Sequence, residues 1–324
     1  MPSRQRHGST ETSEGSRQPN AHLTDSALAL LRASLSDSTK SSYKHSWLAL
    51  LQFCNNSNNS LQLPVSEITL CNFIAHLFEK HYSPSSIASM LSAISYIHKI
   101  LGLCDNSQTF LVRKILQGAN KSASYPDSRL PITLPILSRI TNALDKTISE
   151  HFNRSLLCSI FTLALHGFFR MGELIAKKPA FLTKVVQRED VSFPEAGCVQ
   201  VIIRYSKTMQ NVHPITLFIS GTNSSYTCPV QSLRAYLSSH IHFSGPLFQF
   251  ASGVPVSQHF VSSHLQKAIT FIGLSPKLYK SHSFRIGAAT EATKRGLSQT
   301  EIQKLGRWKS DAFQKYIRIS SFKV

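Results

Sequence analysis

The sequence predicts a mainly α-helical protein of two domains, with a small antiparallel β-sheet in the second domain. Three observations support this prediction. Apolar residues recur at helical spacing over residues 37–118, and a polar stretch at 119–130 interrupts the pattern. The helical spacing then returns, gives way to alternation near residues 198–219, and resumes towards the end of the chain. With 324 residues, the chain is long enough for two ordinary domains.

Residues 1–25 are rich in Ser, Gln, Arg and Gly and almost lack large apolar side chains. They bury too little surface to offset the entropy of ordering, so we expect a disordered leader. The region 37–118 is predicted to be a bundle of four or five helices. Its apolar stripes are Tyr43, Trp47, Leu51 and Cys54, then Leu70, Phe73, Ile74 and Leu77, then Ile87, Leu91, Ile94, Ile97 and Leu101, and last Phe110, Ile115 and Leu116.

The polar stretch 119–130 is predicted to be a linker, and 131–324 is predicted to be the second domain. A new helical pattern opens at Pro131, and a further helix stops around Gly167. Beyond this point the period changes from helical spacing to alternation, which places two strands of an antiparallel sheet between helices. The alternating residues are 198–205 and 215–219, and helices resume from Pro229.

The charge of the chain indicates a polyanionic partner. Lys and Arg number 35 against 17 Asp and Glu, so the formal net charge is +18 and the sequence pI is near 9.9. Residues 129–324 hold 24 of the basic and 9 of the acidic residues, so we expect them to make most of the contacts with nucleic-acid phosphates. The alternative is a basic surface that only keeps the protein soluble. Lys40 and Lys44, one helical turn apart, are candidate DNA contacts in the first domain, or simply a solvated helix face.

Cysteine and histidine spacing argues against structural metal or disulfides. The six cysteines lie far apart without a C-x-x-C pair, and the histidines are scattered. The sequence lacks an apolar run of the roughly 18 residues that span a bilayer, and its N-terminus lacks the apolar segment of an export signal. We therefore expect an intracellular, soluble protein without a metal site.

Residues 281–318 are the most informative segment. His282 and Arg285 are three positions apart, so on a helix they share a face, and their side chains could reach the same phosphate. Gly287 and two following alanines keep this helix slim for close packing. Gly296 is suited to its left-handed cap.

Two shorter helices are expected after this one. Ser298 and Glu301 form a possible capping box for a helix that closes at Gly306. Ser310 is expected to cap a last helix, which runs through Phe313 and Tyr316.

The order H-x-x-R at 282–285, L-G-R-W at 305–308 and then Tyr316 resembles the catalytic end of the tyrosine recombinases, or phage-integrase family. The stretch LGRWKSDAFQKYIR is similar to enzymes of eukaryotic DIRS-class and Crypton mobile elements. The R-x-x-E-L pattern of the family matches 170–174, and its hairpin lysine matches Lys207. The likeness runs from about residue 37 to the end. It implies that 37–118 is a helical core-binding domain, which contacts DNA, and that 131–324 is the catalytic domain.

The resemblance implies a reaction in which Tyr316 attacks a DNA phosphodiester and Lys207 protonates the leaving 5′-oxygen. Arg170 and Arg285 would stabilise the phosphate oxygens with forked donors. His282 would hydrogen-bond the phosphate or accept the tyrosine proton, and the tryptophan would donate its indole N–H. The implied catalytic set is Arg170, Lys207, His282, Arg285, Trp308 and Tyr316, with Glu173 behind it to orient a basic neighbour.

The resemblance also implies the partners and the place of action. The expected partners are double-stranded DNA and further copies of the chain, which would form a dimer or tetramer on the DNA. Neither a membrane nor a cofactor is expected. A phosphotyrosine keeps the energy of the cut bond, which agrees with a sequence that has neither a P-loop nor a carboxylate cluster for Mg²⁺. A eukaryotic source would place the protein in the nucleus, and any other source in the cytoplasm.

Each of these residues, taken alone, has a simpler interpretation. Tyr316 and Trp308 could be core residues, and Arg170 and Lys207 could be ordinary surface charges. Two other functions also remain open: a DNA-binding protein that keeps the fold without catalysis, and a relaxing enzyme of the topoisomerase IB type. Tyr279 is the next candidate nucleophile, because it lies close in sequence to the H-x-x-R pair.

Overall fold

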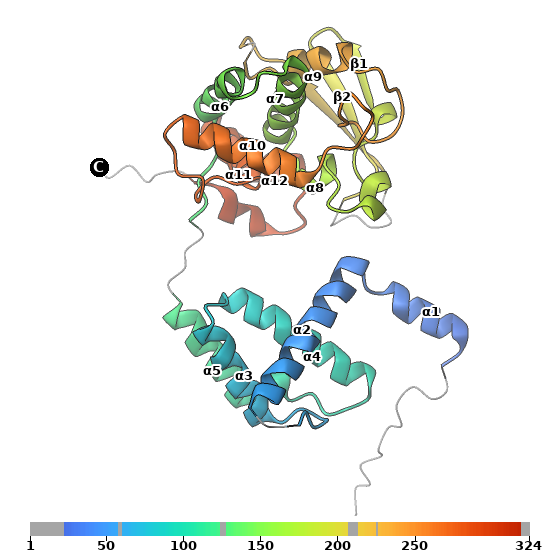
Figure 1. Ribbon diagram of the computed structural model, residues 1–324, viewed down its shortest axis with the longest axis vertical. Coiled ribbons are helices and arrows are strands. Elements are labelled where there is room, and N and C mark those ends of the chain that lie inside the picture. Colours follow the sequence, from blue (N-terminus) through green and yellow to red (C-terminus); the bar gives the residue numbers. More distant parts are fainter. Residues whose placement is uncertain (1–22, 58–59, 124–127, 207–212, 225, 319–324) are drawn as a thin grey trace, which may run out of the picture. The chain divides into compact units, whose positions relative to one another are not determined.

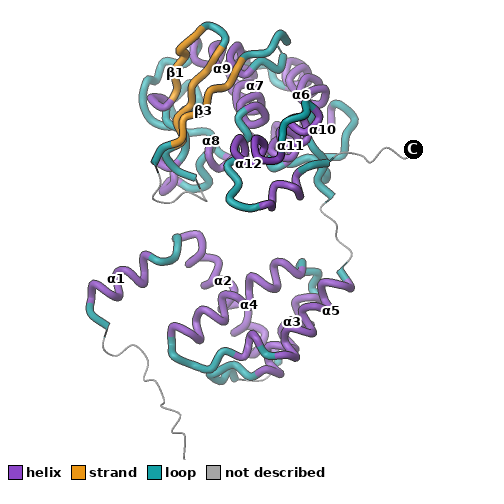
Figure 2. The backbone as a smooth tube through the Cα atoms, turned by 180° about the vertical axis from the view of Figure 1, so that it is seen from behind, coloured by secondary structure: helices purple, strands orange, loops and turns teal. Residues whose placement is uncertain are grey.

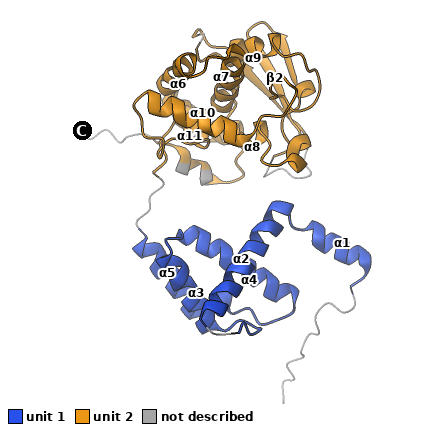
Figure 3. Cartoon of the chain, viewed as in Figure 1, with its two compact units in different colours: residues 1–126 blue, residues 127–324 orange. Residues whose placement is uncertain are grey.

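The computed structural model describes residues 23–57, 60–123, 128–206, 213–224 and 226–318. The chain forms two compact units, residues 1–126 and 127–324, each with its own hydrophobic core (Figure 3). Within the described residues the chain is mostly helical, with a single three-stranded antiparallel sheet in unit 2. The predicted fold class is thus confirmed.

Unit 1 is a helical bundle (Figure 1). Its elements are α1 (Asp25–Ala33), α2 (Asp37–Asn56), α3 (Glu67–Glu79), α4 (Pro84–Ile100), the 3₁₀ helix η1 (Asn106–Gln108) and α5 (Phe110–Ser122). Ser36, Ser66 and Ser83 begin three of these helices by accepting a hydrogen bond from a backbone N–H in the first turn. The side chains that fill the core between α2, α3, α4 and α5 include Leu50, Phe73, Ile74, Ile87 and Ile94.

Two boundaries of unit 1 differ from the prediction. Helix α1, capped by Thr24, is not predicted from the sequence, and none of its residues is buried. Of the predicted leader, residues 1–22 lie outside the described residues. Helix α5 continues to Ser122, so the first residues of the predicted linker are helical; residues 124–127 also lie outside the described residues.

Unit 2 packs helices around a central one, α7. The helices are α6 (Leu134–Thr147), α7 (His151–His166), α8 (Met171–Leu174), α9 (Pro229–Ser238), α10 (Gln258–Phe271), α11 (Ser283–Lys294) and α12 (Gln299–Gly306), with the 3₁₀ helices η2 (Pro179–Lys184), η3 (Arg188–Asp190) and η4 (Asp311–Tyr316). Helix α11 is buried on nearly all sides, and Phe284 on it stacks on Phe161 of α7 with ring centroids 5.2 Å apart.

The prediction that α11 is slim for close packing is confirmed at Gly287. A Cβ atom there would lie 1.9 Å from the carbonyl oxygen of Ile132, so only glycine fits. Ile132 donates its N–H to the carbonyl of Ser283 at 3.0 Å, as Leu130 does to that of Leu278 at 2.9 Å. The predicted helix start at Pro131 is therefore wrong. Residues 130–132 form backbone hydrogen bonds with residues at and before the start of α11, and α6 begins at Leu134.

The sheet has the order β1–β2–β3, with both pairs antiparallel (Figure 2). Its strands are β1 (Val191–Glu195), β2 (Cys198–Ile203) and β3 (Ile215–Ser220). The two strands expected from alternation are present, and Val201 pairs with Leu217 in the register. Strand β1 is not predicted, because Pro194 and a short exposed end obscure its alternation.

Candidate active site

Three segments that are distant in sequence meet in unit 2: the corner between α7 and α8, the start of α11, and the chain from the end of α12 through η4. Arg170 sits at the N-cap of α8, and Glu173 lies one turn later. The Glu173 carboxylate accepts from the backbone N–H of Arg170 at 3.0 Å and from its guanidinium at 2.9 Å. Glu173 therefore contacts a basic neighbour, Arg170, and its expected role in orienting that neighbour stays a prediction.

Arg285 lies on α11 and is only 1% exposed. Its guanidinium donates to the carbonyl oxygens of Phe168 and Gly306 and lies over the ring of Trp308, 4.1 Å from the centroid. Its Nε has no hydrogen-bond partner among the residues that the structure describes. Burial, together with repulsion from Arg170, lowers the pKa of Arg285 to about 9, so the group still carries its charge at neutral pH.

His282 and Tyr316 share a hydrogen bond. The distance from Nε2 of His282 to the phenol oxygen of Tyr316 is 2.9 Å, and the ring centroids are 5.1 Å apart. Both side chains are partly exposed, so a substrate can reach them. Since His282 lies at the N-cap of α11, it shares its element with Arg285 as predicted. An imidazole in this position can take the proton of the phenol.

The indole ring of Trp308 contacts two other residues of the site, Arg285 and Tyr316. The Arg285 guanidinium lies over this ring, the ring centroid of Tyr316 is 5.4 Å from that of Trp308, and the ring of Phe313 packs beside it at 5.9 Å. A Cβ atom on Gly306 would lie 1.5 Å from this ring, so the glycine makes room for the tryptophan. Trp308 therefore supports both the guanidinium and the phenol; its expected role as an indole N–H donor stays a prediction.

Arg307 is a site residue that the sequence does not predict. Its side chain is 2% exposed and donates to Glu173 at 2.8 Å and to the carbonyl of Gly167 at 3.1 Å. Glu173 thus holds one arginine on each side. The buried Glu173 carboxylate needs a positive charge nearby to offset the cost of its burial. Arg307, which supplies such a charge, lies 134 positions away, and the spacing of residues in the sequence gives no sign of a contact over that distance.

Four further residues are candidates from the sequence, namely Lys207, Lys40, Lys44 and the alternative nucleophile Tyr279. Lys207 falls outside the described residues, just beyond the end of β2. Lys40 and Lys44 are exposed on α2 of unit 1, and Lys40 pairs with Asp37 at 3.5 Å. Tyr279 is buried, and burial raises the pKa of its phenol, so it is a poorer candidate nucleophile than Tyr316.

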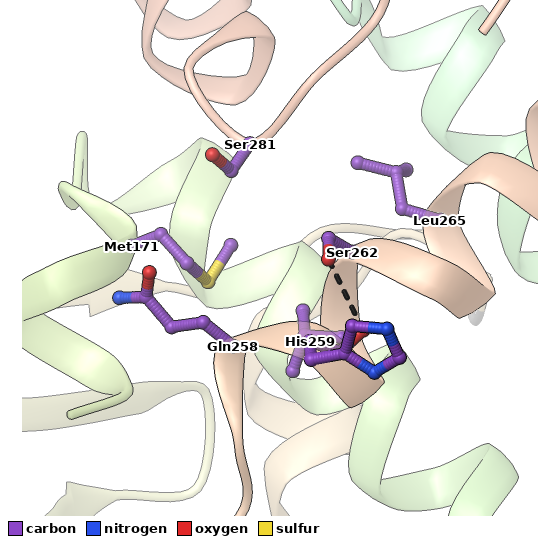
Figure 4. A pocket seen from close by; sticks show the side chains of 7 residues that line it. Met171, Gln258, His259, Ser262, Leu265 and Ser281 are labelled. Atoms are coloured by element: carbon purple, nitrogen blue, oxygen red, sulfur yellow. Dashed lines mark hydrogen bonds between the residues drawn. The ribbon is translucent and has the colours of Figure 1, made fainter. Parts of the chain in front are cut away.

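A small cavity of about 170 Å³ borders the site (Figure 4). It adjoins the cluster because Met171 follows Arg170 and Ser281 precedes His282 in the chain. Ser262 in its wall donates to the carbonyl of His259 at 3.1 Å. The side chains that line it are Met171, Gln258, His259, Val261, Ser262, Leu265 and Ser281.

Within the described ranges, His, Cys, Asp and Glu side chains do not gather in any group of three or more that could hold a metal ion. The same part of the chain contains no helix that is both long and apolar enough to cross a membrane.

Comparison with known proteins gives one curated relative and several solved structures. The chain is 23% identical over 302 residues to the integrase/recombinase xerD homolog of Selenomonas ruminantium, which covers 90% of this chain and 84% of that protein. No protein-family model matches the chain.

Three of the similar structures are DNA complexes. The XerH site-specific recombinase on its palindromic difH substrate has a TM-score of 0.61 and 16% identity, covering 85% of this chain and 75% of that one. A lambda integrase dimer bound to a COC′ core site has a TM-score of 0.59 and 16% identity, covering 89% and 74%. The Tn1549 transposon integrase with transposon right end DNA has a TM-score of 0.64 and 12% identity, covering 91% and 94%. The chain therefore has the tyrosine recombinase fold, and the likenesses support the tyrosine recombinase/integrase family.

Proposed function

We propose that this protein is a site-specific DNA recombinase that cleaves and rejoins DNA strands through a covalent 3′-phosphotyrosine at Tyr316. The hydrogen bond of 2.9 Å between Tyr316 and His282 carries the proposal, because it pairs a phenol with a proton acceptor in the cluster that contains Arg285. A phosphate bound by Arg170 and Arg285 would lie within reach of that phenol. The names of the curated relative and of the similar structures, which are recombinases and integrases, support the same function.

The chemistry follows from the residues of the site. A phenol is protonated at neutral pH, so His282 takes the proton as the Tyr316 oxygen attacks phosphorus. The new bond joins the phenol oxygen to phosphorus, and the bond from phosphorus to the 5′-oxygen breaks. Lys207 donates the proton that this leaving oxygen needs. In the reverse direction a 5′-hydroxyl attacks the phosphotyrosine and releases the phenol, so rejoining needs no nucleotide.

The arginines take the place that a metal ion has in other phosphoryl-transfer enzymes. The transition state gathers negative charge on the non-bridging oxygens, and fixed guanidinium donors stabilise it without reorganisation. Glu173 keeps the fork of Arg170 in one orientation. We therefore propose that cleavage does not depend on a metal ion.

The proposed partners are double-stranded DNA and further copies of the chain. Similar structures include a lambda integrase dimer on a core site and a lambda integrase tetramer on a Holliday junction, which supports a dimer or tetramer on DNA. The stretch LGRWKSDAFQKYIR, with its likeness to DIRS-class and Crypton enzymes, supports an origin in a eukaryotic mobile element. Such an origin would place the protein in the nucleus.

The test is capture of the covalent intermediate from a library of nicked DNA duplexes with randomised sequence. A nick near the cut lets the 5′-hydroxyl fragment diffuse away, so the adduct survives denaturing electrophoresis, and peptide mapping locates the linkage. We expect an adduct at Tyr316 in the wild type and none in Tyr316→Phe, which should still bind DNA. If the wild type forms an adduct with none of the duplexes, the result would favour the alternative of a DNA-binding protein without catalysis. Relaxation of supercoiled plasmids irrespective of their sequence would instead identify a topoisomerase.

A further inference from the structure

The chain from Arg307 to Arg318, which carries Tyr316, is fixed by side-chain hydrogen bonds at both ends. At its first residue the Arg307 guanidinium donates to Glu173 at 2.8 Å and to the carbonyls of Gly167 at 3.1 Å and Phe168 at 3.2 Å. These acceptors belong to the α7–α8 corner, which also presents Arg170. The start of the segment is therefore tied to the residues that would bind the phosphate.

The backbone at Arg307 shows that these bonds determine the conformation. Arg307 has a φ of 55°, in the left-handed region that L-residues disfavour and that glycine usually fills after a helix. The neighbouring glycine, Gly306, is the last residue of α12 and so lies one position before this left-handed residue. Its lack of a side chain makes room for the Trp308 ring instead. The arginine keeps a disfavoured conformation because its buried side chain is bonded on several sides.

Thr290 on α11 holds the other end. It is 1% exposed, and its hydroxyl oxygen accepts the backbone N–H of Arg318 at 3.1 Å. The same oxygen lies 3.4 Å from the carbonyl oxygen of Tyr316 and 2.8 Å from that of Ile286, to which its proton is available. One buried hydroxyl thus contacts the chain on both sides of Ile317, directly after the nucleophile.

We propose that Arg307 and Thr290 are positioning residues that hold the segment bearing Tyr316 in the site of its own chain. The inference rests on the proposed function. Delivery of Tyr316 to a neighbouring subunit would have to break both anchors, and breaking the first would leave the buried Glu173 carboxylate with one cation fewer. Tyr316 therefore attacks the phosphate that is bound by the arginines of the same polypeptide.

The first experiment mixes two inactive variants, Tyr316→Phe and Arg285→Ala, on the nicked duplex that wild type selects from the randomised library. Attack within one chain predicts that the mixture forms no more adduct than either variant alone. Exchange of tyrosines between subunits predicts adduct at a substantial fraction of the wild-type amount, which would overturn the proposal. Wild type runs in parallel: if it forms no adduct, the proposed function itself fails.

The second experiment tests the anchor at Thr290 with a matched pair. Thr290→Val keeps the shape of the side chain and removes the hydroxyl, whereas Thr290→Ser keeps the hydroxyl. Loss of one buried hydrogen bond corresponds to roughly three- to tenfold, so we expect Val to slow adduct formation by that factor at unchanged DNA affinity, and Ser to restore the rate. A Val variant at the wild-type rate, or a Ser variant as slow as Val, would contradict the role.

The third experiment tests Arg307. Arg307→Gly suits the left-handed backbone and removes the guanidinium, so a loss of adduct formation in a folded protein assigns the effect to the side chain. Arg307→Lys keeps a charge but lacks the fork and should recover only part of the rate. Full activity of the glycine variant would show that the segment does not need this anchor.

Discussion

Glu173→Gln is the sharpest test of how the site is built. The Glu173 carboxylate is 5% exposed and lies 2.8 Å from Arg307 and 2.9 Å from Arg170. It is the carboxylate that faces three neighbouring guanidinium groups, the third being that of Arg285. Glutamine has nearly the same shape, but it removes the charge and turns an N–H donor towards one of the two arginines.

The expected loss follows from burial. Removing one partner of a buried ion pair costs about 3–5 kcal/mol, whereas an exposed pair contributes about 1 kcal/mol or less. Arg307 is 2% exposed and Arg170 is 22% exposed, so the Arg307 pair dominates. We expect the free energy of unfolding of unit 2 to fall by about 3 kcal/mol, which for a typical urea slope lowers the midpoint by about 1.5 M.

The assay is urea unfolding followed by tryptophan fluorescence. The chain has two tryptophans, of which Trp308 reports on unit 2, so the measurement uses a Trp47→Phe background. Glu195→Gln on the exposed end of β1 is the matched control and should change the free energy of unfolding by less than about 0.5 kcal/mol. A Glu173→Gln midpoint equal to the control would show that the carboxylate does not hold the arginine cluster together.

Four further outcomes are expected. Adduct formation should persist in excess EDTA, and loss of activity that Mg²⁺ restores would refute the arginine mechanism. The logarithm of DNA affinity should fall with the logarithm of salt concentration at a slope of magnitude about 5 or more, and a slope near zero would refute binding through many phosphate contacts. Gly306→Ala would force a Cβ to 1.5 Å from Trp308, so differential scanning fluorimetry should show a destabilisation of about 1–3 kcal/mol, whereas Gly197→Ala, with open space around it, should change little. Burial lowers the pKa of His166 to about 4, so the unfolded chain binds a proton there first as the pH falls below about 6.5. Stability should thus decline between about pH 6.5 and pH 4, and a pH series on His166→Gln that declines as steeply as wild type would contradict this.

The parts of the fold that the sequence predicts are those whose signals are local. Capping by Ser298 and Glu301, with helix α12 closing at Gly306, is confirmed because both signals lie within a few residues of the boundary they set. Helix α1 and strand β1 are not predicted, since neither buries a regular stripe. Their positions depend on the rest of the chain, which periodicity does not report.

The site divides in the same way. The pairs His282 with Arg285 and Arg170 with Glu173 lie one turn apart, so spacing alone places each pair on one face. Arg307 directly follows the helix that is predicted to close at Gly306. From the sequence alone it looks like an ordinary basic residue at a helix C-terminus. Only the fold shows that it completes a buried ion pair, because the requirement for it arises at a carboxylate on a different element.

In the proposed reaction, the charges of the cluster would favour the transition state of phosphoryl transfer over the bound substrate. Arg170, Arg285 and Arg307 bring three positive charges to Glu173, which supplies one negative charge, so the cluster retains an excess of two. Without substrate, the buried Arg285 donates to two neutral carbonyls, which stabilise a cation less than an anion does, and its Nε has no hydrogen-bond partner among the described residues. A phosphodiester brings one negative charge and its pentacovalent transition state brings a second. In the proposed reaction the excess charge would therefore be matched most closely as the bond to Tyr316 forms, which is the condition for stabilising the transition state more than the bound substrate.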